Sequence, residues 1–175
     1  MKLNKLMMAV AFALGSVSVV NAADQGHGTV SFTGAVIDAP CSIAPDSIDQ
    51  VVELGQISNV ALQADGGTGI SKPQNFEIHL EGCTLTTANT VTTTFTGAAG
   101  KGNRLGVTGD AKGASIVLAD GAGNPIELGK PVAAQQLQDG NNALLFSAYM
   151  QGDGMADEIV PGDFKGVVDF SLAYQ

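Results

Sequence analysis

The sequence is poor in the residues that build metal sites and basic surfaces. Its 175 residues include no tryptophan, two histidines, two cysteines and eight lysines and arginines, against 17 acidic residues. Neither His27 nor His79 stands at a metal-like spacing from a cysteine or a carboxylate pair, so we expect no bound metal. The formal net charge of -9 argues against nucleic acid and anionic membranes as partners, because both are bound through basic patches.

Motifs of the common enzyme classes are also missing. The pairs Gly100-Lys101 and Gly129-Lys130 are followed by Gly102 and Pro131, so neither ends a phosphate-binding loop. No Gly-x-Ser-x-Gly nucleophile elbow occurs. The acidic segment 153–163 lacks the spacing of a calcium-binding loop, which favours a solvated loop. We therefore expect neither an enzyme nor a cofactor.

A long apolar run occurs only near the N-terminus. Lys2 and Lys5 precede the run from Leu6 to Val20, and Val20-Asn21-Ala22 supplies small residues at the positions that a signal peptidase reads. The run has about 15 residues, whereas a membrane-spanning helix needs roughly 20. We predict a signal peptide over 1–22, and a single-domain product of 153 residues that is not membrane-embedded. Cleavage removes two basic residues and no acidic one, which moves the formal net charge to -11.

Cys41 and Cys83 are the only cysteines. The export signal places them in an oxidising compartment, so we expect one disulfide between them. A two-cysteine metal site is the rival interpretation, and it fails on the number of ligands. Closing a loop of this length removes about 4 kcal/mol of unfolded-chain entropy in the loop-closure description.

Alternating residues near the start of the mature chain predict a strand over 28–36. One face carries Gly28, Val30, Phe32, Gly34 and Val36, and the other carries Thr29, Ser31 and Thr33. Because the segment follows the export signal almost directly, it would form a nearly free N-terminal arm in the mature protein.

Further strands are predicted along the chain from the same alternation. The segment 56–73 is expected to be a loop with a possible short helix, because Gly66-Gly67 and Pro73 limit any regular element. The expected strands are 42–43, 50–55, 75–81, 91–95, 114–118 and 143–151, with a shorter one near 105–107 inside the loop 97–113, and with an acidic loop over 152–162.

The last predicted strand is the longest and runs from Gly162 to Tyr174. Its apolar face has Gly162, Phe164, Gly166, Val168, Phe170, Leu172 and Tyr174. Several short strands without a convincing long helix indicate an all-β sandwich of immunoglobulin-like kind. An edge strand with an apolar face needs a neighbour, which could be the chain's own arm or the arm of another copy. The second arrangement would build an open polymer.

Several motifs, in their order along the chain, resemble those of a known family. Gly28 to Gly34 (GTVSFTG) leads into Val36 to Ile43 (VIDAPCSI), and Leu54 to Ile57 (LGQI) and Cys83 follow. The chain ends in FSLAYQ, with Gly162 fourteenth from the end and Tyr174 in the penultimate position. In this combination the chain resembles the chaperone-usher pilins, in particular the major subunits of P-pilus and mannose-resistant type fimbriae.

The resemblance implies an incomplete immunoglobulin-like β-sandwich that lacks its last strand, with a donor-strand extension over 23–37 and a pilin domain over 38–175. It implies a structural subunit of an adhesive fimbrium, which passes through the periplasm to the cell surface. The implied partners are a periplasmic chaperone, an outer-membrane usher, other copies of the chain and adjacent minor pilins. A minor adaptor or tip pilin that contributes to receptor binding is the alternative.

The resemblance also assigns roles to individual residues. Val30 and Phe32 would fill a groove in the neighbouring copy, and Gly28 would lie where that groove is shallow. The expected donor residues are Gly28, Val30, Phe32, Gly34 and Val36, and the expected groove strand and chaperone contact comprise Gly162, Phe164, Val168, Phe170, Leu172, Tyr174 and Gln175.

Overall fold

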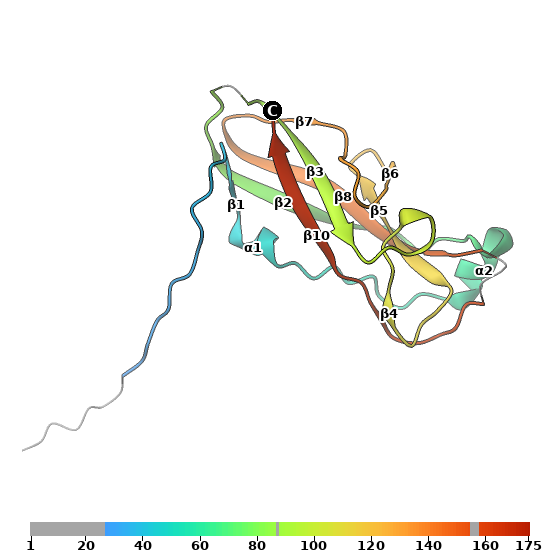
Figure 1. Ribbon diagram of the computed structural model, residues 1–175. Helices are drawn as coiled ribbons and strands as arrows, with labels where there is room; N and C mark the ends of the chain where they lie inside the picture. Colours follow the sequence, from blue (N-terminus) through green and yellow to red (C-terminus); the bar gives the residue numbers. More distant parts are fainter. Residues whose placement is uncertain (1–26, 87, 155–157) are drawn as a thin grey trace, which may run out of the picture. The chain divides into compact units, whose positions relative to one another are not determined.

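The computed structural model describes residues 27–86, 88–154 and 158–175 (Figure 1). The predicted signal peptide over 1–22 lies outside the described residues, and the predicted acidic loop is described only in part. The chain divides after Val36 into two units, and each is treated by itself. Within the described part of the chain, no helix has the length and apolar character that crossing a membrane would require.

The first sheet of the unit 37–175 has five antiparallel strands in the order β1-β2-β8-β5-β6. Alternate side chains of β2 and β8 point inward, and Ile78 and Leu80 are almost completely buried. The predicted strands 42–43, 75–81, 114–118 and 143–151 are thereby confirmed. The observed bounds are β1 Ser42–Ile43, β2 Gln74–Cys83, β5 Ala114–Asp120, β6 Pro125–Ile126 and β8 Gly140–Gly152.

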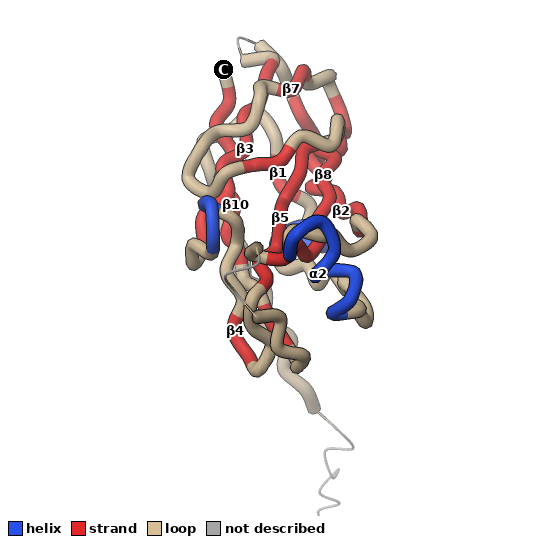
Figure 2. The backbone as a smooth tube through the Cα atoms, turned by 90° about the vertical axis from the view of Figure 1, so that its right-hand side faces the viewer, coloured by secondary structure: helices blue, strands red, loops and turns tan. Residues whose placement is uncertain are grey.

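The second sheet has three antiparallel strands in the order β10-β3-β7. They are β3 Thr90–Gly97, β7 Gln135–Gln136 and β10 Val168–Tyr174. Figure 2 shows β10 and β3 in one layer, with β2 and β8 in the other. Phe95 of β3 meets Phe146 of β8 edge-on, with ring centroids 5.0 Å apart, so the core lies between the two sheets. The predicted all-β sandwich is confirmed.

Short elements occupy the connections. A two-stranded sheet joins β4 (Thr108–Gly109) to β9 (Phe164–Lys165). Helix α2 (Asn59–Gly67) confirms the short helix expected within 56–73, and a 3-10 turn covers Lys101–Asn103. Helix α1 (Pro45–Ile48) was not predicted, although Pro45 stands at a helix start, where proline is favoured.

Three sequence predictions are wrong in detail, mostly because a strand requires a partner. Residues 50–55 form no strand, and near 105–107 only Leu105 makes bridges. Residues 28–36 are extended without a strand partner in the single chain, so their donor strand stays a prediction. The last strand is broken into β9 and β10, and β8 is the longest strand. The break falls where the segment changes neighbours, because Phe164 lies opposite Gly109 of β4 and Val168 lies opposite Gly97 of β3.

Candidate functional site

Strand β10 lies at an edge of the three-stranded sheet. It pairs with β3 over its whole length, from Val168 opposite Gly97 to Tyr174 opposite Val91. No other strand of the described residues pairs with β10. Its second backbone edge is therefore open over seven residues, which is the geometry that can accept an added strand.

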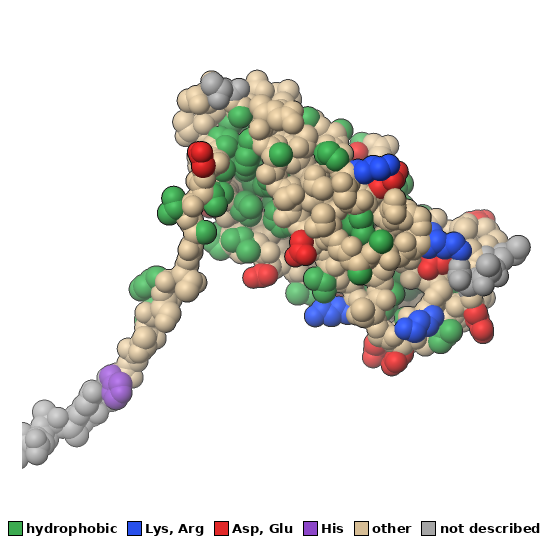
Figure 3. Space-filling view, viewed as in Figure 1, with side chains coloured by type: hydrophobic (Ala, Val, Ile, Leu, Met, Phe, Trp, Pro, Cys, Tyr) green, Lys and Arg blue, Asp and Glu red, His purple; other side chains and the backbone are tan. Residues whose placement is uncertain are grey.

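The side chains of β10 divide into two faces, as the sequence predicted. Val168, Phe170, Leu172 and Tyr174 are half-buried and pack against the core, whereas the residues between them are exposed. The ring of Phe170 lies 6.5 Å from that of Phe95, centroid to centroid. Figure 3 shows hydrophobic side chains gathered alongside β10, on the side toward α1. The open edge thus borders apolar surface that remains partly accessible.

The end of β10 is held in place by hydrogen bonds. The main-chain oxygen of Gln175 accepts bonds from the backbone nitrogens of Asn89, at 2.8 Å, and Thr90, at 3.0 Å. The hydroxyl of Tyr174 is buried and has no hydrogen-bond partner among the described residues. Burial raises the pKa of Tyr174 above its ordinary value, so this side chain behaves as a neutral part of the core.

The predicted C-terminal set is brought together only in part. Val168, Phe170, Leu172 and Tyr174 belong to the strand with the open edge, whereas Gln175 follows that strand and bonds to Thr90 of β3. Phe164 belongs to β9 and lies opposite Gly109, and Gly162 lies against Asp110, where a Cβ atom would come within 2.7 Å of the Asp110 Cβ. Gly162 and Phe164 therefore shape the approach to β10 rather than its open edge.

The outer edge of β2 is closed, in contrast to that of β10. Beyond the two residues of β1, the backbone nitrogen of Ala44 donates to the carbonyl of His79 at 3.0 Å. The backbone nitrogen of His79 donates to the hydroxyl of Ser47 at 2.9 Å, and the side-chain amide of Gln50 donates to the carbonyl of Glu77 at 2.8 Å. Side chains of α1 and its C-terminal flank thus replace a neighbouring strand.

The remaining sheet edges are short and carry proline. Strands β6 and β7 have two residues each. Pro125 lies in β6, and Pro131 makes the bridge to Thr94 of β3. Proline cannot donate a backbone hydrogen bond, so these edges are poor templates for another strand. Among the described strands, β10 alone combines length with an unprotected edge.

Two segments with strand-like patterns lack strand partners. In the unit that ends at Val36, Val30 and Phe32 are 75% and 92% exposed. Residues 50–57 make no backbone hydrogen bond to another described residue, although Leu54 and Ile57 are half-buried against the core. Sequence reasoning recognised the alternation in both segments and predicted a nearly free arm over 28–36, but it did not predict that residues 50–55 would lack a strand partner.

A disulfide joins Cys41 to Cys83, which confirms the predicted pairing. The backbone nitrogen of Thr84 donates to the carbonyl of Pro40 at 2.9 Å. Together these links fix residues 40–41 to the C-terminal end of β2. The start of the pilin-like unit therefore lies at the end of the sandwich where β10 also finishes (Figure 1).

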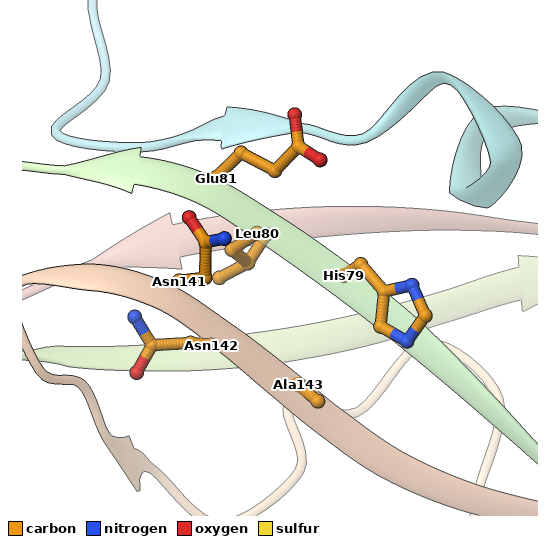
Figure 4. A pocket seen from close by; sticks show the side chains of 6 residues that line it. All are labelled: His79, Leu80, Glu81, Asn141, Asn142 and Ala143. Atoms are coloured by element: carbon orange, nitrogen blue, oxygen red, sulfur yellow. The ribbon is translucent and has the colours of Figure 1, made fainter.

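A shallow polar pocket lies on the outer face of the five-stranded sheet (Figure 4). His79, Glu81, Asn141 and Asn142 contribute to its lining. The side-chain nitrogen of Asn142 donates to the carbonyl of Gln138, and the side-chain oxygen of Asn142 accepts from the backbone nitrogen of Gln138. In the described ranges, no group of three or more histidine, cysteine, aspartate or glutamate residues is arranged to hold a metal ion. The open edge of β10 is therefore the better candidate.

Comparisons with known proteins agree with this geometry. A family model described as "Fimbrial protein" matches residues 30–175. The "Fimbria A protein" of Serratia marcescens is 59% identical over 177 residues, and the "Major MR/P fimbria protein" of Proteus mirabilis (strain HI4320) is 51% identical over 179 residues. Both alignments cover 100% of each chain.

A solved structure of a chaperone-usher pilus, described as revealing the molecular basis of rod uncoiling, is 34% identical with a TM-score of 0.76. It covers 86% of this chain and 97% of its own. The sandwich is therefore the immunoglobulin-like pilin fold, and the chain is a structural subunit of a pilus shaft. The chain belongs to the fimbrial protein family, among the major pilins of the chaperone-usher class.

Proposed function

We propose that the chain builds its fibre by strand donation, in which residues 28–36 of one copy occupy the open edge of β10 in the next. The observation that carries this proposal is the unpaired seven-residue edge of β10, with an apolar face half-buried against the core. An added strand would supply backbone hydrogen bonds along the edge and place alternate side chains over the core. The role is structural, without catalysis or a cofactor.

The donated strand is expected to run antiparallel to β10, because every strand pair in the sandwich is antiparallel. The apolar face of the arm has five positions, and these match five inward positions over 166–174. In this register, a glycine of one strand lies opposite a larger residue of the other strand near both ends of the pair. The proposed neighbours are Gly28 with Tyr174, Val30 with Leu172, Phe32 with Phe170, Gly34 with Val168, and Val36 with Gly166.

The second flank of the donated strand would be residues 50–57. These residues have no strand partner, and the half-buried side chains of Leu54 and Ile57 pack against the core. A strand laid between them and β10 would give both segments their missing hydrogen bonds. This explains why the alternation over 50–55 predicts a strand that the single chain does not form.

The donor has to be another copy, because the chain cannot reach its own edge in that direction. An antiparallel arm would place Val36 near the beginning of β10, roughly 24 Å along the strand from its end. Pro40 is fixed at the opposite end of the sandwich by Thr84. Residues 37–40 span at most about 14 Å even when fully extended. Donation between copies repeats head to tail and gives an open fibre.

An open apolar edge also requires cover before assembly, because such edges aggregate. We assign this cover to a periplasmic chaperone, and the exchange for the next arm to an outer-membrane usher. In this scheme residues 1–22 are removed on export, residues 23–37 form the donor extension and residues 38–175 the acceptor domain. The finished fibre stands on the cell surface and adjoins minor pilins. The alternative role, as a minor adaptor or tip pilin, has less support from the relatives.

The variant Phe32→Asp tests the proposal, with Ser31→Asp as the matched control. Both add one negative charge to the arm, but only Phe32 would enter the neighbouring core, where Val30 and Phe32 each contribute about 1.5–3 kcal/mol. We expect wild type and Ser31→Asp to run as a ladder in cold detergent and to collapse to monomer on heating. Phe32→Asp should give monomer only, and a normal ladder from it would refute strand donation.

A further inference from the structure

His79 is the only histidine within residues 38–175, because the other histidine, His27, belongs to the arm. Histidine is the side chain whose charge ordinarily changes between about pH 5 and 8. The ring of His79 lies on the outer face of β2 (Figure 4), and its Nε2 atom is 2.9 Å from Oε2 of Glu77. Its Nδ1 atom is 3.7 Å from Oδ2 of Asp46 on α1. The ring therefore stands between a strand of the sheet and helix α1.

The surroundings of this ring are acidic. The two residues of β1 are uncharged, and so is Ala143, which lies opposite His79 on β8. The charged groups on the elements packed against the ring are all carboxylates, namely Glu77 and Glu81 of β2, Asp46 of α1 and Asp49 directly after that helix. The pKa of His79 is raised, chiefly by its hydrogen bond to Glu77. A proton on the ring is therefore stabilised by negative charge from two elements.

The two protonation states of the His79 ring interact differently with α1. The carboxylate of Glu77 can only accept a hydrogen bond, so Nε2 carries a proton in both states. In the neutral ring, Nδ1 has a lone pair that faces a carboxylate oxygen of Asp46, and this contact is not attractive. In the charged ring, Nδ1 carries a proton as well, and its distance to Asp46 is that of an ion pair. Protonation therefore links α1 to β2, and deprotonation removes the link.

Asp46 is also joined to the contacts that close the edge of β2. The hydroxyl of Ser47 donates to Oδ1 of Asp46 at 3.3 Å and accepts from the backbone nitrogen of His79 at 2.9 Å. The side-chain amide of Gln50 donates to the carbonyl of Ser47 at 3.3 Å. A continuous chain of contacts thus runs from the His79 ring through Asp46 and Ser47 to Gln50.

Gln50 begins the segment 50–57, which is the proposed second flank of the donated strand. This segment makes no backbone hydrogen bond to another described residue, and Leu54 and Ile57 are half-buried against the core. Its position therefore depends on its ends, and α1 anchors one of them. We propose that His79 is a pH-sensitive latch, which in its charged form holds α1 and the segment 50–57 in place beside a donated strand. This proposal rests on the proposed strand donation.

The latch is expected to have a modest effect, because the side chain of His79 is 45% exposed. Exposed ion pairs are weak, and salt screens them. A donated strand can leave only when its flanks move, so loosening one flank should speed its release. We expect release to be about two- to fivefold faster at about pH 8 than at about pH 5.5, at low salt.

The release of subunits from assembled fibres tests the latch. Wild-type and His79→Gln fibres would be held in detergent at a temperature where the ladder collapses slowly. The rate at which monomer appears would be measured at about pH 5.5 and about pH 8. We expect the wild-type rates to differ about two- to fivefold and the His79→Gln rates to be nearly equal, because glutamine does not titrate.

Asp46→Asn examines the link to α1 separately from the hydrogen bond within β2. It keeps a side-chain oxygen for Ser47 and removes the charge that faces the ring, so the dependence of release on pH should shrink. The variant also serves if His79→Gln accumulates poorly. The matched control is Asp49→Asn, which removes the same charge at a position where no described contact joins the carboxylate to the ring, and it should keep the wild-type difference.

The outcomes separate the latch from strand donation. Equal wild-type release rates at the two pH values would overturn the latch, and so would an undiminished difference in His79→Gln or Asp46→Asn. A urea midpoint that depends on pH without a release rate that does so would also overturn it, because His79 would then act on the single chain alone. In all these cases strand donation stands, whereas a wild type without a ladder at either pH would refute donation itself.

Discussion

Along the outer edge of β2, the backbone of His79 accepts a hydrogen bond from Ala44 and donates one to Ser47, and Gln50 caps the carbonyl of Glu77. Along the outer edge of β10, no described strand, helix or capping side chain plays this part. Both edges belong to the same small sandwich. The chain is therefore able to close an edge with a few local side chains, and it leaves open the one that borders partly accessible apolar surface.

The closed edge of β2 contributes to the stability of the single chain, whereas the open edge of β10 is available for assembly of the fibre. Closing the edge of β2 uses residues 44–50, which lie close in sequence to β1 and cost little chain entropy to place. Closing the edge of β10 needs a strand of about seven residues with an apolar face, and the arm has that pattern. The closed edge serves the single chain, whereas the open edge serves the fibre. Changes at the two edges should accordingly have different consequences.

The largest effect is expected from removing the open edge. Deletion of 170–175 takes away Phe170, which contacts Phe95, and the backbone ladder to β3. The core would lose one wall, so we expect no folded protein to accumulate in the periplasm, as measured by blotting a periplasmic extract. A stable, soluble truncated monomer would contradict the structural role assigned to β10.

A smaller effect is expected from opening the closed edge of β2. Ser47→Ala removes the buried hydroxyl that accepts a hydrogen bond from the backbone nitrogen of His79, which should lower the free energy of unfolding by about 1–3 kcal/mol. Ser42→Ala, at an exposed position of β1, is the control and should change it by less than about 0.5 kcal/mol. Urea unfolding of the two variants distinguishes them. Equal stability would mean that Ser47 does not cap this edge.

The smallest effect concerns pH at the same edge. The pKa of His79 is raised, first by its hydrogen bond to Glu77 at 2.9 Å and then by the charge of Asp46 on α1. Since folding raises this pKa above its ordinary value of about 6.5, the added stability is fully present below that pH and is lost as the pH rises through the folded-state pKa. The urea midpoint of wild type should therefore fall slightly between about pH 5.5 and 8. In His79→Gln, the fall of the urea midpoint with pH should be smaller. If the midpoint of this variant falls as much as that of wild type, His79 is not the cause of the fall.

Much of the sandwich could be predicted from the sequence because its strands carry their own signal. Alternating apolar residues place Phe76, Ile78 and Leu80 of β2 correctly, and the same holds for the inward residues of β3. The export context of Cys41 and Cys83 was enough to predict their disulfide. In these cases local pattern and tertiary structure agree.

The remaining errors arise where the structure depends on a neighbour. Residues 50–55 have a strand pattern without a strand partner, since a strand exists only in a sheet. The break between β9 and β10 reflects a change of partner from β4 to β3, two strands that are distant in sequence from this segment. The capping roles of Ser47 and Gln50 left no pattern beyond Pro45 at the start of α1. Which residues close an edge could therefore not be predicted from periodicity.

The central claim is that the arm of one copy closes the open edge of β10 in another, and a fusion tests it most directly. A second copy of residues 27–37 would be attached after Gln175 through a flexible linker of about four residues, and the native arm would be deleted. Because Gln175 stands where an antiparallel donor begins, the fused strand can reach the edge that the native arm cannot.

We predict that the fusion is monomeric, forms no ladder and unfolds at least about 10 °C above the arm-deleted chain without the fusion, since Val30, Phe32 and Val36 become buried. The same fusion carrying Phe32→Asp should lose that gain. A fusion that is no more stable than the arm-deleted chain would contradict the account.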